Sequence, residues 1–174
     1  MPTADVLEPL LDSWDRNNII TANLLRSIPP DAIDLEPADG SPSIAQLFMH
    51  MHYVRLIFVE EDAPEFARET PKGEWTVERD RDRLVQMLHD SAKAVRDAVR
   101  DRIESHREML RHYDHPLLML QHLIWHEGYH HGQIKLTMKM AGRPFDDQAI
   151  GPLTWAVWMK KSNEPGPQKA QPAS

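Results

Sequence analysis

The sequence predicts an all-α protein folded as an antiparallel four-helix bundle. Four long segments place apolar residues at helical spacing, and no stretch alternates β-branched and polar residues as a strand would. The connections between these segments are modest in length, so antiparallel packing is the simplest way to bury four apolar stripes. A chain of 174 residues with 41% hydrophobic composition can build one such core.

The first two helices are bounded by clear start and stop signals. The first is expected over residues 5–27, because Pro29 follows and cannot continue a helix. Asn18 lies inside its apolar stripe, which predicts a buried hydrogen-bonding residue. The second helix opens at Ser43, a favourable N-cap residue, and ends before Pro64.

The second half of the bundle follows a longer connection. About 15 polar residues join the second and third helices, which is long for a bundle and predicts a lid over one end. The third helix is expected over residues 77–105, with its many Arg and Asp side chains on a solvated face. The fourth begins at Pro116 and ends near Gly142, because proline suits a first helical turn and glycine suits the position after a last one.

The C-terminal part adds little to the predicted bundle. Residues 150–161 are apolar and predict a short additional helix. Residues 162–174, rich in Pro, Gln and Ala, predict a disordered tail. The chain is therefore expected to form one bundle domain over residues 1–161 followed by this tail.

Composition excludes several classes of partner. The 20 Lys and Arg residues are outnumbered by 27 Asp and Glu, and no basic run is present, so nucleic acid is not an expected partner. The chain has no Cys, which leaves histidines and carboxylates as the only strong metal ligands. No window approaches the roughly 18 apolar residues of a membrane span, and no signal-like start is present, so we expect no membrane partner and a cytoplasmic protein.

The stretch HEGYHHGQI in the fourth helix has the spacing of metal ligands. With roughly 100° per residue, His126, Glu127 and His130 project to the same side as the apolar Leu123 and Ile134. Each buried polar side chain costs roughly 1–3 kcal/mol unless a partner satisfies it. A divalent cation would satisfy them together, which predicts a metal site inside the bundle.

The second helix offers a third ligand. His50 falls on the same side as Val54, whereas His52 falls on the opposite side and is expected to face solvent. His50 with His126 and His130 would form a three-nitrogen site that leaves positions open for water or substrate.

Other polar and aromatic residues near this site receive weaker assignments. Glu127 is the candidate catalytic residue for proton transfer, with an orienting or structural role as the alternative. Trp125 and Tyr129 are expected to be packing residues. Seven histidines are assigned to the surface or to helix ends: His52, His89, His106, His112, His115, His122 and His131.

Two familiar metal motifs fit this stretch less well. Residues 126–130 satisfy the HExxH pattern of zinc peptidases, but Gln133 and Leu136 stand where the longer form needs Gly and His. The next glutamate is Glu164, and no strand is expected that could align a peptide substrate. The sequence also matches the Glu-x-x-His element of di-iron bundles, but it has no second copy. A zinc peptidase is thus a minor alternative and a ferritin-like oxidase is disfavoured.

Taken together, two segments resemble a known family. SIAQLFMHM, with His50 seven residues after Ser43, and HxxxHHGQI in the fourth helix are similar to the DinB-like superfamily of metal-binding four-helix bundles. The resemblance covers roughly residues 5–144 and implies that His50, His126 and His130 hold a divalent metal. It also implies nickel, zinc or iron as the metal, and commonly a homodimer.

The resemblance further implies an activity class. Where the family often has Arg after the last ligand, this chain has His131. Characterised relatives include thiol S-transferases and isomerases that use low-molecular-weight thiols such as bacillithiol or mycothiol. We therefore expect a metal-dependent S-transferase or hydrolase with a small-molecule substrate, in which the metal activates a thiol or water. A non-enzymatic metal-binding or stress-response protein with a structural ion is the alternative.

Overall fold

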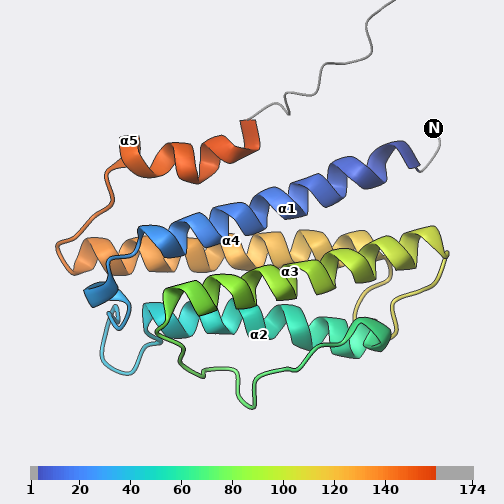
Figure 1. Ribbon diagram of the computed structural model, residues 1–174, viewed down its shortest axis with the longest axis horizontal. Coiled ribbons are helices and arrows are strands. Elements are labelled where there is room, and N and C mark those ends of the chain that lie inside the picture. Colours follow the sequence, from blue (N-terminus) through green and yellow to red (C-terminus); the bar gives the residue numbers. More distant parts are fainter. Residues whose placement is uncertain (1–3, 160–174) are drawn as a thin grey trace, which may run out of the picture.

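The computed structural model describes residues 4–159 and confirms the all-α bundle. Four long helices lie side by side, and no strand occurs in the described range (Figure 1). They are α1 (Ala4–Ser27), α2 (Ile44–Asp62), α3 (Arg81–Glu104) and α4 (Pro116–Met140). Five short helical segments complete the described range: η1 (Pro30–Ala32), η2 (Pro64–Phe66), α5 (Asp147–Ile150), η3 (Gly151–Leu153) and η4 (Trp155–Met159).

Helix direction does not alternate strictly along the chain. One core cluster joins the first halves of α1 and α4 to the second halves of α2 and α3, and the other cluster joins the opposite halves. Consequently α1 and α4 run one way, and α2 and α3 run the other way, as Figure 1 also shows. The antiparallel arrangement expected from the sequence holds between the two pairs but not between α2 and α3. Residues 63–80 carry the chain back along the length of α2 before α3 begins, instead of closing one end of the bundle.

Side-chain caps fix where the helices begin. Ser43 and Gln46 form a reciprocal capping box at the start of α2, as Ser43 predicts. The start of α3 lies four residues after the expected residue 77, because the Asp80 side chain accepts hydrogen bonds from the first-turn amides. The start of α4 at Pro116 agrees with the prediction.

The C-terminal part forms short turns against α1 rather than one helix. In place of a single helix over residues 150–161, the chain makes α5, η3 and η4, and Arg16 Nη1 of α1 donates to the Val157 carbonyl at 2.7 Å. The predicted disordered tail, residues 162–174, lies outside the described residues. No helix within residues 4–159 has both the length and the hydrophobicity needed to cross a bilayer.

Candidate metal centre

Three histidine side chains from two helices converge in the bundle. The Nε2 atom of His126 lies 3.0 Å from Nε2 of His50 and 3.0 Å from Nε2 of His130. Nitrogens bound to one cation at about 2.0–2.1 Å stand about 3–3.5 Å apart, so the cluster has the size of a metal site. The structure thus brings together the three residues that the sequence proposes as ligands, and each offers one ring nitrogen.

The environment keeps these rings neutral. His50 and His130 are buried and His126 is half-buried. Burial lowers the pKa of His50 and His126 to about 4, and it lowers the pKa of His130 as well. A neutral imidazole has one nitrogen lone pair free, which is the form that binds a metal.

Neighbouring groups orient two of the rings. The Nδ1 atom of His130 lies 2.6 Å from Oε1 of Gln133, and since an amide oxygen only accepts, this Nδ1 carries the proton and Nε2 is the lone-pair atom. The Nδ1 atom of His50 lies 3.0 Å from Oε1 of Glu74, although the angle falls outside hydrogen-bond geometry. The Trp75 ring stacks flat on His50, with centroids 4.4 Å apart. Residues 63–80 therefore cover the His50 side of the cluster.

Glu127 takes part in a buried ion pair next to the cluster. Its Oε1 accepts from Arg55 Nε at 2.6 Å, and its Oε2 accepts from Arg55 Nη2 at 2.7 Å, Asn17 Nδ2 at 2.7 Å and Thr21 Oγ1 at 3.1 Å. Burial is the largest single influence and raises the pKa of Glu127, but Arg55, His131 and Thr21 together outweigh burial and leave the pKa below its ordinary value. These contacts match the structural role given as the alternative; the proton-transfer role stays a prediction.

The cation in this pair, Arg55, is absent from the sequence-based site. It is fully buried, and its Nη1 donates to Asn18 Oδ1 at 2.9 Å and to the Leu88 carbonyl at 2.7 Å. Its guanidinium also lies 4.9 Å from the centre of the Trp14 ring. Asn18 is buried and hydrogen-bonded, as predicted. A carboxylate that points into the core, such as Glu127, needs a cation on a facing helix. This requirement could have pointed to Arg55 from the sequence.

Several histidines lie deeper than the sequence predicts. His52 is buried instead of facing solvent, because α2 packs against α3 as well as α4. His131 is half-buried and its Nε2 lies 2.9 Å from Thr21 Oγ1, beside Glu127. His122 is also half-buried, and its Nδ1 lies 2.8 Å from the Tyr113 hydroxyl. The surface positions expected for three others are confirmed: His106, His112 and His115.

Two aromatic residues of α4 that are expected to be packing residues do not pack in the core of the described chain. Trp125 is 69% exposed and Tyr129 is 56% exposed. Both lie on the side of α4 that faces away from the core, where they stack on each other with centroids 6.3 Å apart. Helix α4 has apolar residues on both its inner and its outer side, so apolar character alone does not show which side is buried.

The fold and the cluster define a helical bundle with three histidines placed to hold a metal ion. The model of the DinB family matches residues 1–148, and the chain therefore belongs to the DinB family. This confirms the recognition made from the two histidine motifs. Neither the curated proteins nor the solved structures include a match to this chain.

Proposed function

We propose that His50, His126 and His130 bind one divalent cation through their Nε2 atoms, and that the protein is a metal-dependent enzyme acting on a small molecule. The observation that carries this proposal is the convergence of three neutral imidazoles without a fourth side-chain ligand. Within residues 4–159, the group of potential ligands has three members. Structural zinc sites have four protein ligands, whereas catalytic sites keep a position open, so the count favours an enzyme over a structural ion.

A site of three imidazoles suits nickel, zinc or iron. When bound, such a cation supplies Lewis acidity, which makes a thiol or a water molecule a stronger acid near neutral pH. This supports a thiol S-transferase with a low-molecular-weight thiol as co-substrate, or a hydrolase. Around the site, Gln133 orients the ring of His130 by a hydrogen bond, Glu74 places a negative charge 3.0 Å from His50 Nδ1, and Trp75 stacks on His50 and shields one side from water.

Within this proposal, Glu127 positions the site. Four donors already engage its carboxylate, and it follows His126 directly in α4. The ion pair with Arg55 ties α4 to α2 and so sets how α4 is rotated toward His50. Holding ligands to within about 0.5 Å is what such supporting contacts achieve in metal sites.

Metal analysis of the purified protein tests the ligand assignment. We expect about one equivalent of a divalent metal in the wild type and almost none in His130→Ala, because two imidazoles hold the ion far less tightly. His106→Asn is the matched control, since His106 is exposed and asparagine tolerates its positive φ of 54°. A full equivalent of metal in His130→Ala would show that the assignment is wrong.

A substrate screen tests the enzyme. Thiols paired with electrophiles, and a parallel set of hydrolysable esters, are assayed with protein that has been stripped by a chelator and then reloaded. Activity that disappears with the metal and returns with it supports the enzyme. If the stripped protein instead loses its helical circular dichroism and no reaction is found, the structural-ion alternative is favoured.

We also propose that two copies of the chain pair through the outer side of α4. An apolar row there is left open to solvent in the single chain, with each member between 44% and 69% exposed: Leu118, Trp125, Tyr129, Leu136 and Met140. Steps of four or seven residues keep these side chains on one side of the helix. A contiguous apolar strip of this kind is typical of a protein interface, which supports the expected homodimer.

A further inference from the structure

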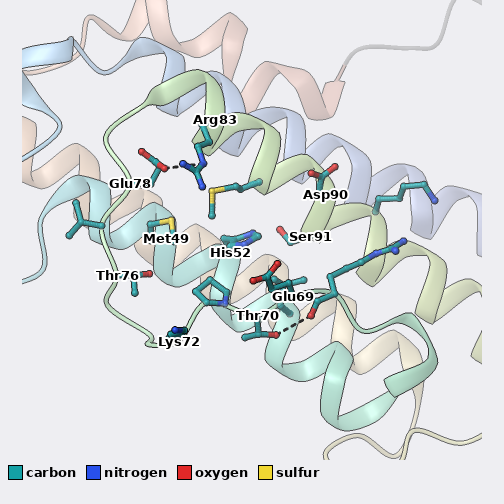
Figure 2. Close-up of a pocket in the computed structure, with 16 residues that line it drawn as sticks. Met49, His52, Glu69, Thr70, Lys72, Thr76, Glu78, Arg83, Asp90 and Ser91 are labelled. Atoms are coloured by element: carbon teal, nitrogen blue, oxygen red, sulfur yellow. Dashed lines mark hydrogen bonds and ion pairs between the residues drawn. The ribbon is translucent and has the colours of Figure 1, made fainter.

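A cavity of about 810 Å³ lies on the other side of α2 from the three histidines. Its walls come from α2, from the first half of α3 and from residues 68–78, and none of the three histidines lines it (Figure 2). Its volume falls within the range of about 300–1,000 Å³ found for small-molecule sites. The cavity is thus large enough for an organic ligand and separate from the metal centre.

The bottom of the cavity combines apolar side chains with buried polar atoms. Met49 and Leu56 of α2 are buried there, and Met87 of α3 is half-buried. The His52 ring lines the cavity while only 6% exposed, and its Nδ1 has no hydrogen-bond partner. The hydroxyl of Thr76, also in the wall, has none either. Both atoms are almost completely covered by neighbouring atoms, so they make the base of the cavity partly polar without presenting open hydrogen-bonding positions.

The edge of the cavity carries charges of both signs, and one oppositely charged pair among them is joined. Arg83 pairs with Glu78 at 3.2 Å. Lys93, also in the lining, pairs with Asp97 at 2.5 Å. No ion pair within residues 4–159 involves four other charged lining residues, which are Arg68, Glu69, Lys72 and Asp90. Of these, Lys72 and Asp90 lie on opposite edges of the cavity in Figure 2. Lys72 belongs to residues 63–80, which connect α2 to α3, and Asp90 belongs to α3. A ligand with a negative group at one end and a positive group at the other would complement both.

We infer that this cavity binds a zwitterionic small molecule with an apolar body, of the chemical class of apolar amino acids and short peptides. The carboxylate lies toward Lys72, the amino group lies toward Asp90, and the apolar part contacts Met49 and Met87. The inference is independent of the metal centre, because it uses none of the three histidines.

The test uses the dipeptide leucyl-phenylalanine with the full-length protein in the presence of a chelator, and titration calorimetry as the readout. We expect saturable binding at one site. Acetylating the amino group or amidating the carboxylate should each weaken binding about fivefold, in line with an exposed ion pair worth up to about 1 kcal/mol. If both blocked peptides bind as well as the free one, the zwitterionic class is wrong.

Variants locate the binding site. Lys72→Ala should weaken the free and acetylated peptides about fivefold but leave the amide unchanged, and Asp90→Asn should weaken only peptides with a free amino group. Lys139→Ala, another exposed lysine at the end of α4, is the matched control and should have no effect. Met87→Trp, checked for folding by circular dichroism, should fill the cavity and lower affinity more than tenfold. Absent binding in the wild type, or binding insensitive to both Lys72→Ala and Met87→Trp, overturns the inference.

Discussion

The buried pair of Arg55 and Glu127 gives the sharpest test of how this bundle is held together. Both side chains are 0% exposed, and two hydrogen bonds of 2.6 and 2.7 Å join them. Removing one partner leaves a buried charge without its counter-ion, which costs about 3–5 kcal/mol. We therefore expect Arg55→Met and Glu127→Met each to lower the free energy of unfolding by that amount, a large part of the 5–15 kcal/mol typical of a domain of about this size.

The double variant decides whether the pair acts as a unit. Arg55→Met with Glu127→Met leaves no buried charge, although Asn17 and the Leu88 carbonyl lose a partner. We expect a total loss of about 3 kcal/mol, well below the roughly 6–10 kcal/mol obtained by adding the single variants. Urea unfolding followed by circular dichroism measures all four proteins. Additive losses, or single variants that cost less than about 1 kcal/mol, would refute the argument.

A conservative change separates the two roles of Glu127. In Glu127→Gln the side chain keeps its shape, but its amide nitrogen must face a donor, because all four contacts of the carboxylate come from donors. A positioning role predicts that stability and metal affinity fall together. If instead only the reaction rate falls while stability and metal affinity are unchanged, Glu127 acts in proton transfer.

Three further predictions concern Glu74 beside the histidine cluster, the buried His52 and the outer side of α4. Glu74→Gln should weaken metal binding about tenfold in a competition titration, because it removes the negative charge 3.0 Å from His50 Nδ1, and unchanged affinity would remove Glu74 from the site. His52 has its pKa lowered by burial to about 4, so its contribution to stability is present above pH 6.5 and is lost as the pH falls toward 4. Between pH 7.5 and 5, the wild type should lose about 2 kcal/mol more than His52→Gln in urea unfolding, and parallel pH profiles would contradict this. Trp125→Ser with Leu136→Ser should convert a dimer to a monomer in analytical ultracentrifugation, and a dimer that persists would place the interface elsewhere.

The sequence predicts side-chain directions well where polar residues share one side of a helix with apolar core residues. In α4, the positions of His126, Glu127 and His130 relative to Leu123 follow from helix geometry, and the structure finds Glu127 and His130 buried there with His126 beside them. Capping chemistry at Ser43 and Pro116 likewise fixes where two helices begin. In such places a local rule and the tertiary packing agree.

The sequence predicts burial poorly for a helix that is covered on nearly every side by other parts of the chain. Helix α2 contacts α3 and α4 and lies under residues 63–80, so nearly every side of it is covered. A helical-wheel prediction that assumes one buried side then assigns His52 to the solvent and misses Arg55. Both side chains are buried. The spacing of apolar residues also does not predict that α2 and α3 run parallel, because their relative direction depends on the path of residues 63–80. That path brings Trp75 onto His50, a contact no local pattern encodes.

The ion pair of Arg55 and Glu127 has a consequence for how a cation would be loaded into the proposed metal site. Because it fixes the rotation of α4 from within the core, the three imidazoles face one another through contacts of the polypeptide itself. Loading a cation then requires no refolding and little rearrangement. A protein emptied by chelation should take up its ion again in a single fast phase, with its helix content unchanged throughout.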